Sequence, residues 1–158
     1  MNGFTFDSSC VDDTKRLSFA LASCLKGGEI LFFRGPIGAG KTVMVSAIAE
    51  AFGFKQKPVS ASFSIMKKYE NKNITIYHID LFRLSEGEMF NLGFEEMLRD
   101  EHALILAEWP DPAENFFPSD RLEIEVTLKE GNSRSISANA TGKISENILK
   151  ELCKKINK

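Results

Sequence analysis

The sequence has little of what disulfide-bonded or membrane proteins need. Only three of its 158 residues are cysteine, and Cys10, Cys24 and Cys153 form no C-x-x-C pair. An odd number of distant cysteines argues against a disulfide framework and against a zinc or redox centre. No apolar run approaches the roughly 20 residues of a membrane-spanning helix, and no N-terminal stretch has the pattern of a secretory signal. We therefore expect a soluble, cytoplasmic protein with no membrane partner.

A dominant charge is also missing. The chain has 20 basic and 22 acidic residues, which gives a formal net charge of −2. This balance excludes an overall positive charge that would attract nucleic acid. We therefore expect any interaction with RNA to involve a partner protein or a local basic patch. With 43% apolar residues, 11 Gly and 5 Pro, collagen-like and wholly disordered chains are excluded as well.

Helix-like and strand-like patterns alternate along the chain. Dense apolar runs at residues 29–34 and 103–108 predict buried strands, and strict alternation at 122–128 predicts a half-buried strand. Asp12 or Asp13 can cap a helix that runs to residue 25. The remaining expected elements are strands at 4–6 and 133–138, a hairpin of 63–69 with 74–80, helices at 41–52 and 144–156, and helical turns at 86–90 and 94–99.

A glycine-rich segment after the first buried strand carries the strongest signal. Residues 35–42, GPIGAGKT, satisfy the phosphate-binding pattern G-x-x-x-x-G-K-[ST]. Such a loop points backbone N–H groups at a phosphate, a solvated Lys41 reaches the β- and γ-phosphates, and the Thr42 hydroxyl can ligate Mg²⁺. The predicted nucleotide-binding residues of the loop are Pro36, Ile37, Gly38, Ala39, Gly40, Lys41 and Thr42. The predicted fold is α/β, a single P-loop NTPase-like domain over residues 1–158 with a mixed central sheet flanked by helices.

Acidic residues end two of the predicted strands. Asp80 closes the strand at 74–80 and Glu108 closes the strand at 103–108, so both fit the acid that P-loop enzymes use to hold magnesium and position water. Ligands of open α/β sheets bind at the carboxyl ends of strands, which favours a functional role for at least one acid. Either can also be simply a solvated strand end. The hydroxyl-rich segment with Ser60 and Ser62 fits a turn or a phosphate-sensing switch.

The order of these motifs resembles the TsaE (YjeE) family. Beyond the glycine-rich loop, the matching elements are Thr14 in the first helix, the serine segment 60–64, YHIDLFRL at 77–84, an L-G-x-x-E element at 92–96 and EWP at 108–110. The run of motifs covers residues 14–110 and is far more specific than any one of them.

The resemblance implies an ATPase accessory subunit of threonylcarbamoyladenosine modification of tRNA. Proteins of this family use ATP as substrate with Mg²⁺, act with the modification enzyme TsaD and its partner TsaB, and meet tRNA indirectly. By this resemblance, Thr42 and Glu108 would ligate Mg²⁺, and Lys41, Asp80 and Glu108 would form the catalytic set. The further nucleotide contacts that it implies are Thr14 and Arg134.

Trp109, the only tryptophan, directly follows Glu108 and precedes Pro110. Proline favours an extended conformation at the residue before it, and the strand at 103–108 delivers the indole to the same sheet end as the phosphates. We interpret Trp109, with Ser60 and Ser62, as a switch or partner residue. The alternative is a core or rim tryptophan without a ligand.

Two other functions remain open from the sequence alone. The P-loop by itself permits a small-molecule kinase, although little sequence remains for the arginine-rich lid of a nucleoside kinase. A nucleotide-gated binding module with negligible hydrolysis is the second alternative. The guanine-specificity pattern N-K-x-D is missing, because residues 71–74 read NKNI, and His78 and His102 are too isolated for a metal cluster.

Overall fold

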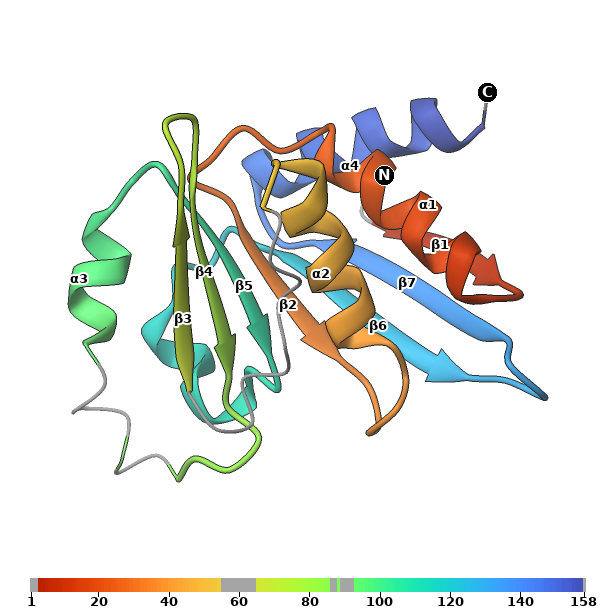
Figure 1. The fold of residues 1–158 in the computed structure, drawn as a ribbon, viewed down its shortest axis with the longest axis horizontal. Coiled ribbons are helices and arrows are strands. Elements are labelled where there is room, and N and C mark those ends of the chain that lie inside the picture. Colours follow the sequence, from red (N-terminus) through yellow and green to blue (C-terminus); the bar gives the residue numbers. More distant parts are fainter. Residues whose placement is uncertain (1–2, 55–64, 86–87, 89–92, 158) are drawn as a thin grey trace.

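The computed structural model describes residues 3–54, 65–85, 88 and 93–157 (Figure 1). These residues form a seven-stranded sheet in the order β1-β7-β6-β2-β5-β4-β3. The strands are β1 Gly3–Ser8, β2 Ile30–Arg34, β3 Met66–Glu70, β4 Thr75–Asp80, β5 Ala103–Glu108, β6 Leu122–Leu128 and β7 Arg134–Ala140. The helices are α1 Val11–Ala22, α2 Lys41–Ala51, α3 Phe94–Arg99 and α4 Lys143–Ile156, with a short 3₁₀ helix at Asp111–Phe116.

The sheet is mixed, which confirms the predicted α/β class. Strand β2 lies between β5 and β6 and pairs with both in parallel, and β4 pairs with β5 in parallel. The outer pairs β1/β7, β6/β7 and β3/β4 are antiparallel. Leu31, Phe32 and Phe33 of β2 have no exposed surface, as expected of a central parallel strand that is covered on both faces.

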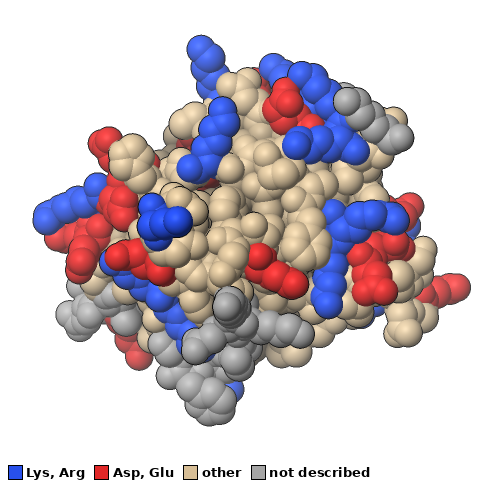
Figure 2. All heavy atoms as spheres, turned by 45° about the horizontal axis from the view of Figure 1, so that its top comes forward, with Lys and Arg blue, Asp and Glu red and all other residues tan. Residues whose placement is uncertain are grey.

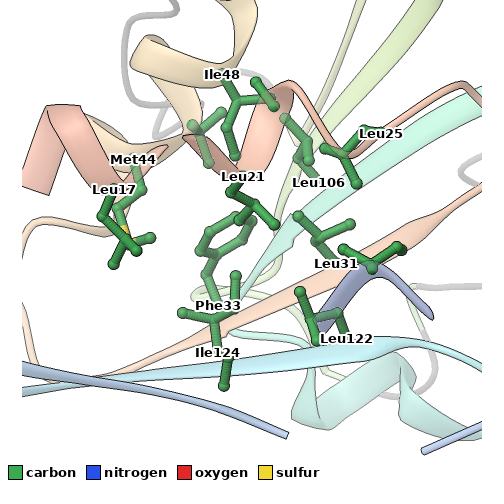
Figure 3. Close-up of a cluster of buried hydrophobic side chains, with 14 of the residues drawn as sticks. Leu17, Leu21, Leu25, Leu31, Phe33, Met44, Ile48, Leu106, Leu122 and Ile124 are labelled. Atoms are coloured by element: carbon green, nitrogen blue, oxygen red, sulfur yellow. The ribbon is translucent and has the colours of Figure 1, made fainter. Parts of the chain in front are cut away.

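Helices cover the two faces of the sheet unequally. One face packs against α1, α2 and α4, and Figure 3 shows Leu17 and Leu21 of α1 with Met44 and Ile48 of α2 above Phe33 of β2. The other face carries a smaller cluster in which α3 and the 3₁₀ helix cover Phe32 and its neighbours. The sheet is therefore the middle of three layers, and its strand ends remain free to form a site.

The structure confirms most of the expected elements and corrects one helix boundary. The strands Ala103–Glu108 and Leu122–Leu128 have the predicted bounds, and β3 and β4 form the predicted hairpin. Helix α1, however, starts after Cys10, so the two candidate caps lie in its first turn, where their charge suits the helix dipole. Asp13 instead accepts a hydrogen bond from the Ser9 N–H group at 3.0 Å. The helix ends at Ala22 because residues 24 and 25 continue in three-residue turns.

Parts of two other predictions lie outside the described residues. These are the first two residues of the predicted hairpin, at 63–64, and most of the predicted turn at 86–90. None of the helices formed by the described residues is long and apolar enough to cross a membrane. On the face seen in Figure 2, the coloured basic and acidic side chains are interspersed, in keeping with the small net charge.

Candidate nucleotide-binding site

The candidate site lies at the carboxyl ends of three neighbouring parallel strands. The glycine-rich loop follows β2 and leads into α2, and Asp80 and Glu108 are register partners at the ends of β4 and β5. A cavity of about 600 Å³ opens at this edge, as expected for an open α/β sheet. Predicted site residues in its lining are Ile37, Gly38, Gly40, Lys41, Thr42, Asp80, Glu108 and Trp109.

Two glycines fix the shape of the loop. Gly35 has a φ of 139°, and a Cβ atom there would lie 2.3 Å from the carbonyl oxygen of Val126 on β6. Gly40 has a φ of 108° and stands directly before α2, so the chain turns sharply into an 11-residue helix. Residues 40–43, at the start of this helix, line the cavity, and the free N–H groups of a first helical turn are the usual basis of phosphate binding.

Lys41 is buried against the loop, which corrects the expected solvated side chain. It is only 4% exposed. Its Nζ donates hydrogen bonds to the carbonyl oxygens of Gly35 at 2.6 Å and Pro36 at 2.9 Å, and it lies 4.3 Å from the centre of a Trp109 ring. Burial lowers the pKa of the Lys41 ammonium, and the negative charges of Glu108 and Asp80 oppose that shift. The ammonium is thus held inside the site.

Glu108 connects the loop to the sheet. The Thr42 hydroxyl donates a hydrogen bond to Oε1 of Glu108 at 2.9 Å, and Nε2 of His78 lies 2.7 Å from Oε2. Glu108 is 2% exposed and His78 is fully buried. Sequence reasoning did not select His78 for a role, although its place two residues before Asp80 puts both side chains on the same face of β4.

The side-chain oxygen atoms of the site are of the chemical type that binds Mg²⁺. Thr42 and Glu108 offer hydroxyl and carboxylate oxygens, and Asp80 adds a second carboxylate beside them. Within the part of the chain that the structure describes, no group of three His, Cys, Asp or Glu residues could hold a metal ion. Magnesium is commonly bound by one or two carboxylates together with substrate phosphates and water. This donor set therefore suits a metal that arrives with a nucleotide.

The environment of Asp80 disfavours the negative charge of its carboxylate. Burial, reinforced by the nearby negative charge of Glu108, raises the pKa of this carboxyl, while the hydrogen bond from the Phe82 N–H group and the charges of His78 and Lys41 act in the opposite direction. The Phe82 N–H group donates to Oδ1 at 3.1 Å. The folded state therefore carries an unfavourable negative charge at this position.

We predict that Asp80→Asn raises the thermal unfolding temperature at neutral pH. Because the folded-state pKa is raised, the folded protein binds the Asp80 proton more tightly than the unfolded chain does, and stability falls as pH rises through that pKa. An asparagine can keep the bond from Phe82 and removes the charge. The gain should disappear at a pH low enough to protonate the carboxyl in both states. Equal unfolding temperatures for the variant and the parent at neutral pH would contradict this interpretation.

Trp109 adopts a left-handed backbone conformation instead of the expected extended one. Its φ is 54°, and its N–H group donates to the carbonyl oxygen of Phe33 at 3.2 Å. Its ring packs on Phe82 with centroids 4.8 Å apart. A bulky residue in this region costs on the order of 1–3 kcal/mol and is typical of functional sites.

An ion-pair network holds the segment that follows Trp109. Arg34 at the end of β2 binds Asp111 and Glu114 of the 3₁₀ helix, each at 3.1 Å. Arg121 binds the same Glu114 at 2.5 Å and Glu123 at 3.0 Å. These contacts fix the chain immediately after Pro110, so the neighbouring tertiary structure stabilises the strained tryptophan.

Arg134 and Thr14 are predicted nucleotide contacts that have other partners in the structure. Arg134 donates from Nε to the carbonyl oxygen of Ala39 at 3.0 Å, so it contacts the backbone of the loop. Thr14 is buried, with its hydroxyl 2.8 Å from that of Ser8. Neither belongs to the described lining of the cavity, and their roles as nucleotide contacts stay predictions. Ser60 and Ser62 lie outside the described residues.

Comparison with known proteins identifies the family. The model of the family described as "Threonylcarbamoyl adenosine biosynthesis protein TsaE" matches residues 8–136, which include the loop, Asp80 and Glu108. The chain belongs to the TsaE family. The resemblance inferred from the order of the motifs is thus confirmed, and with it the family's place in tRNA threonylcarbamoyladenosine biosynthesis.

Relatives and a solved structure agree with this assignment. The Rickettsia felis tRNA threonylcarbamoyladenosine biosynthesis protein TsaE is 36% identical over 80% of this chain and 74% of its own length. The Bacillus subtilis protein of the same name is 31% identical over 89% of this chain and 88% of its own length. A crystal structure of Bacillus subtilis YdiB superposes with a TM-score of 0.84 at 27% identity, covering 98% of this chain and 97% of the other. The fold of YdiB therefore extends along nearly the whole chain.

Proposed function

We propose that this protein is a Mg²⁺-dependent ATPase that serves threonylcarbamoyladenosine modification of tRNA together with TsaD-like and TsaB-like proteins. The hydrogen bond from the Thr42 hydroxyl to Glu108 carries the proposal, because it joins the P-loop to a strand-end acid within the cavity that also holds Lys41. P-loop nucleotidases use this combination of hydroxyl, acid and lysine to bind a triphosphate with its metal. Family membership supports the pathway.

Each residue has a defined part in the proposed reaction. Lys41 and the N–H groups of the loop neutralise charge on the phosphates, which is the main catalytic contribution in phosphoryl transfer. Thr42 and Glu108 would hold Mg²⁺, which supplies further charge neutralisation at the phosphate oxygens when bound. Asp80 faces the same cavity and would orient the attacking water.

An indirect relation to tRNA is part of the proposal. A protein that bound tRNA strongly by itself would present a basic stripe to the phosphate backbone. The net charge of −2 and the interspersed charges on the face seen in Figure 2 favour contact with tRNA through the modification complex instead.

The test measures phosphate release from ATP with Mg²⁺, with and without the purified TsaD–TsaB pair. We expect slow hydrolysis by the protein alone and faster hydrolysis with the pair. A phosphorylated small molecule formed at the expense of ATP would favour the kinase alternative. Nucleotide binding with no hydrolysis under either condition would favour the nucleotide-gated binding module.

We predict that the fluorescence of Trp109 changes when ATP or ADP binds with Mg²⁺. The indole lies beside the Lys41 ammonium, so a phosphate that pairs with this ammonium alters the electric field at the ring. The change should be lost in Lys41→Ala. Trp109→Ala should weaken partner-stimulated hydrolysis more than nucleotide binding. A spectrum indifferent to saturating nucleotide, together with normal activity of Trp109→Ala, would leave Trp109 a structural residue only.

A further inference from the structure

His78 lies underneath the proposed metal site, in the interior of the sheet. It is fully buried on β4, where the next residues on its own face are Ile76 and Asp80. Its register partner on β5 is Leu106, which also has no exposed surface. The only hydrogen bond of the imidazole among the described residues goes to Glu108 at 2.7 Å.

The hydrogen bonds of Glu108 determine which nitrogen of His78 carries the proton. Oε1 of Glu108 accepts from the Thr42 hydroxyl, and Oε2 faces Nε2 of His78. A carboxylate oxygen only accepts, so Nε2 must be the donor. Nδ1 is buried and has no hydrogen-bond partner among the described residues, so the contact with Glu108 is what orients the ring. Nε2 of His78 therefore carries a proton and donates it to Oε2 of Glu108.

This bond fixes the orientation of the Glu108 carboxylate. With Oε2 anchored to the sheet interior, Oε1 points to Thr42 and the loop. Asp80 has no comparable anchor among the described residues of the sheet: it accepts the N–H group of Phe82, two residues ahead in the chain. The two strand-end acids therefore differ, and only Glu108 joins the P-loop hydroxyl to the interior.

We propose that His78 is a positioning residue that holds the Glu108 carboxylate in the orientation needed to bind Mg²⁺. The inference rests on the proposed Mg²⁺-dependent function. Groups that orient a metal ligand through a hydrogen bond typically change metal affinity by 10- to 100-fold when they are lost. His78 should therefore affect the affinity for Mg²⁺ much more than the affinity for the nucleotide.

The test compares four variants that differ in what they offer to Glu108. His78→Phe keeps the ring size and removes the donor. His78→Gln keeps an N–H donor at similar reach, while His78→Asn carries the same amide on a chain that is too short. Ile76→Val is the matched control, because it alters a fully buried side chain on the same face of β4 without touching Glu108.

The readout is the apparent Mg²⁺ affinity in the presence of a non-hydrolysable ATP analogue, followed by calorimetry. We expect His78→Phe and His78→Asn to lower the apparent Mg²⁺ affinity by 10- to 100-fold. His78→Gln should retain most of the parental affinity, and Ile76→Val should have the parental affinity. The affinity for the analogue without Mg²⁺ should differ less than threefold from that of the parent in all four variants. Thermal unfolding without ligand checks that each variant is folded, and the Gln–Asn comparison suffices if the phenylalanine variant is not.

Two contrary results have different meanings. If the parent binds the analogue more tightly with Mg²⁺ but His78→Asn and His78→Gln have the parental Mg²⁺ affinity, the positioning role is wrong and the proposed function stands. If Mg²⁺ has no effect on nucleotide binding by the parent, the proposed function fails, and this inference fails with it.

Discussion

Replacing Lys41 with alanine is expected to weaken ATP binding by about 100-fold or more. Removing one member of a buried charged pair typically costs about 2–5 kcal/mol, and each 1.4 kcal/mol is a factor of ten in affinity. Lys41 is held inside the cavity by the carbonyl oxygens of Gly35 and Pro36, so its charge is in place before a phosphate enters. Calorimetric titration with ATP and Mg²⁺ measures the loss.

A control is needed because the Lys41 side chain also contacts the loop, so its removal can change stability as well as ATP affinity. Its removal leaves two loop carbonyl groups without their donor, and we expect a loss of about 1–3 kcal/mol in the free energy of unfolding with the fold retained. Lys150→Ala removes an exposed lysine of α4 and should alter neither ATP affinity nor stability appreciably. An unchanged ATP affinity in Lys41→Ala would refute the phosphate site.

Replacing Glu108 is expected to reduce Mg²⁺-dependent hydrolysis by about 100-fold or more while ATP still binds. A catalytic metal contributes several kcal/mol of charge stabilisation, and each 1.36 kcal/mol is tenfold in rate, whereas the main phosphate contacts come from the loop. Glu108→Gln is the cleaner variant, because Glu108→Ala also leaves the Thr42 hydroxyl and the His78 ring without their acceptor. Phosphate release and ATP binding are measured on the same preparation.

Glu125→Gln is the matched control for this loss. It removes an exposed carboxylate from β6, which is separated from β5 by β2, and should hydrolyse ATP at the parental rate. If Glu108→Gln also keeps the parental rate, Glu108 is not the metal-binding acid. If only Asp80→Asn then loses hydrolysis, the roles of the two acids are reversed.

Local sequence was sufficient where one segment determines its own structure. The strand Ala103–Glu108 is a continuous apolar run, and Leu122–Leu128 alternates strictly, so both bounds could be read directly. The P-loop could also be predicted from the sequence, because its glycines, Lys41 and Thr42 lie in one segment of eight residues whose local conformation forms the loop. The order of the short motifs was enough to identify the family.

Contacts between distant segments account for what the sequence did not indicate. His78 meets Glu108 only because β4 and β5 pair in one register, and an isolated histidine in an apolar strand carries no sign of that. The rule for residues before proline fails at Trp109, because its bond to Phe33 and the ion pairs of Arg34 impose another conformation. Lys41 is buried by carbonyl oxygens of its own loop and by Trp109, which no helical pattern reveals.

The central place of β2 has a consequence for folding on the ribosome. The two neighbours of β2, strands β5 and β6, come much later in the chain: Ile30 pairs with Ile105 and Leu31 pairs with Leu122. Contacts between such distant residues form slowly, because a long loop must close first. The P-loop thus leaves the ribosome well before the strands that support it, and we expect nascent chains that end before β6 to lack nucleotide affinity. Synthesis itself delays activity until almost the whole sheet has been made.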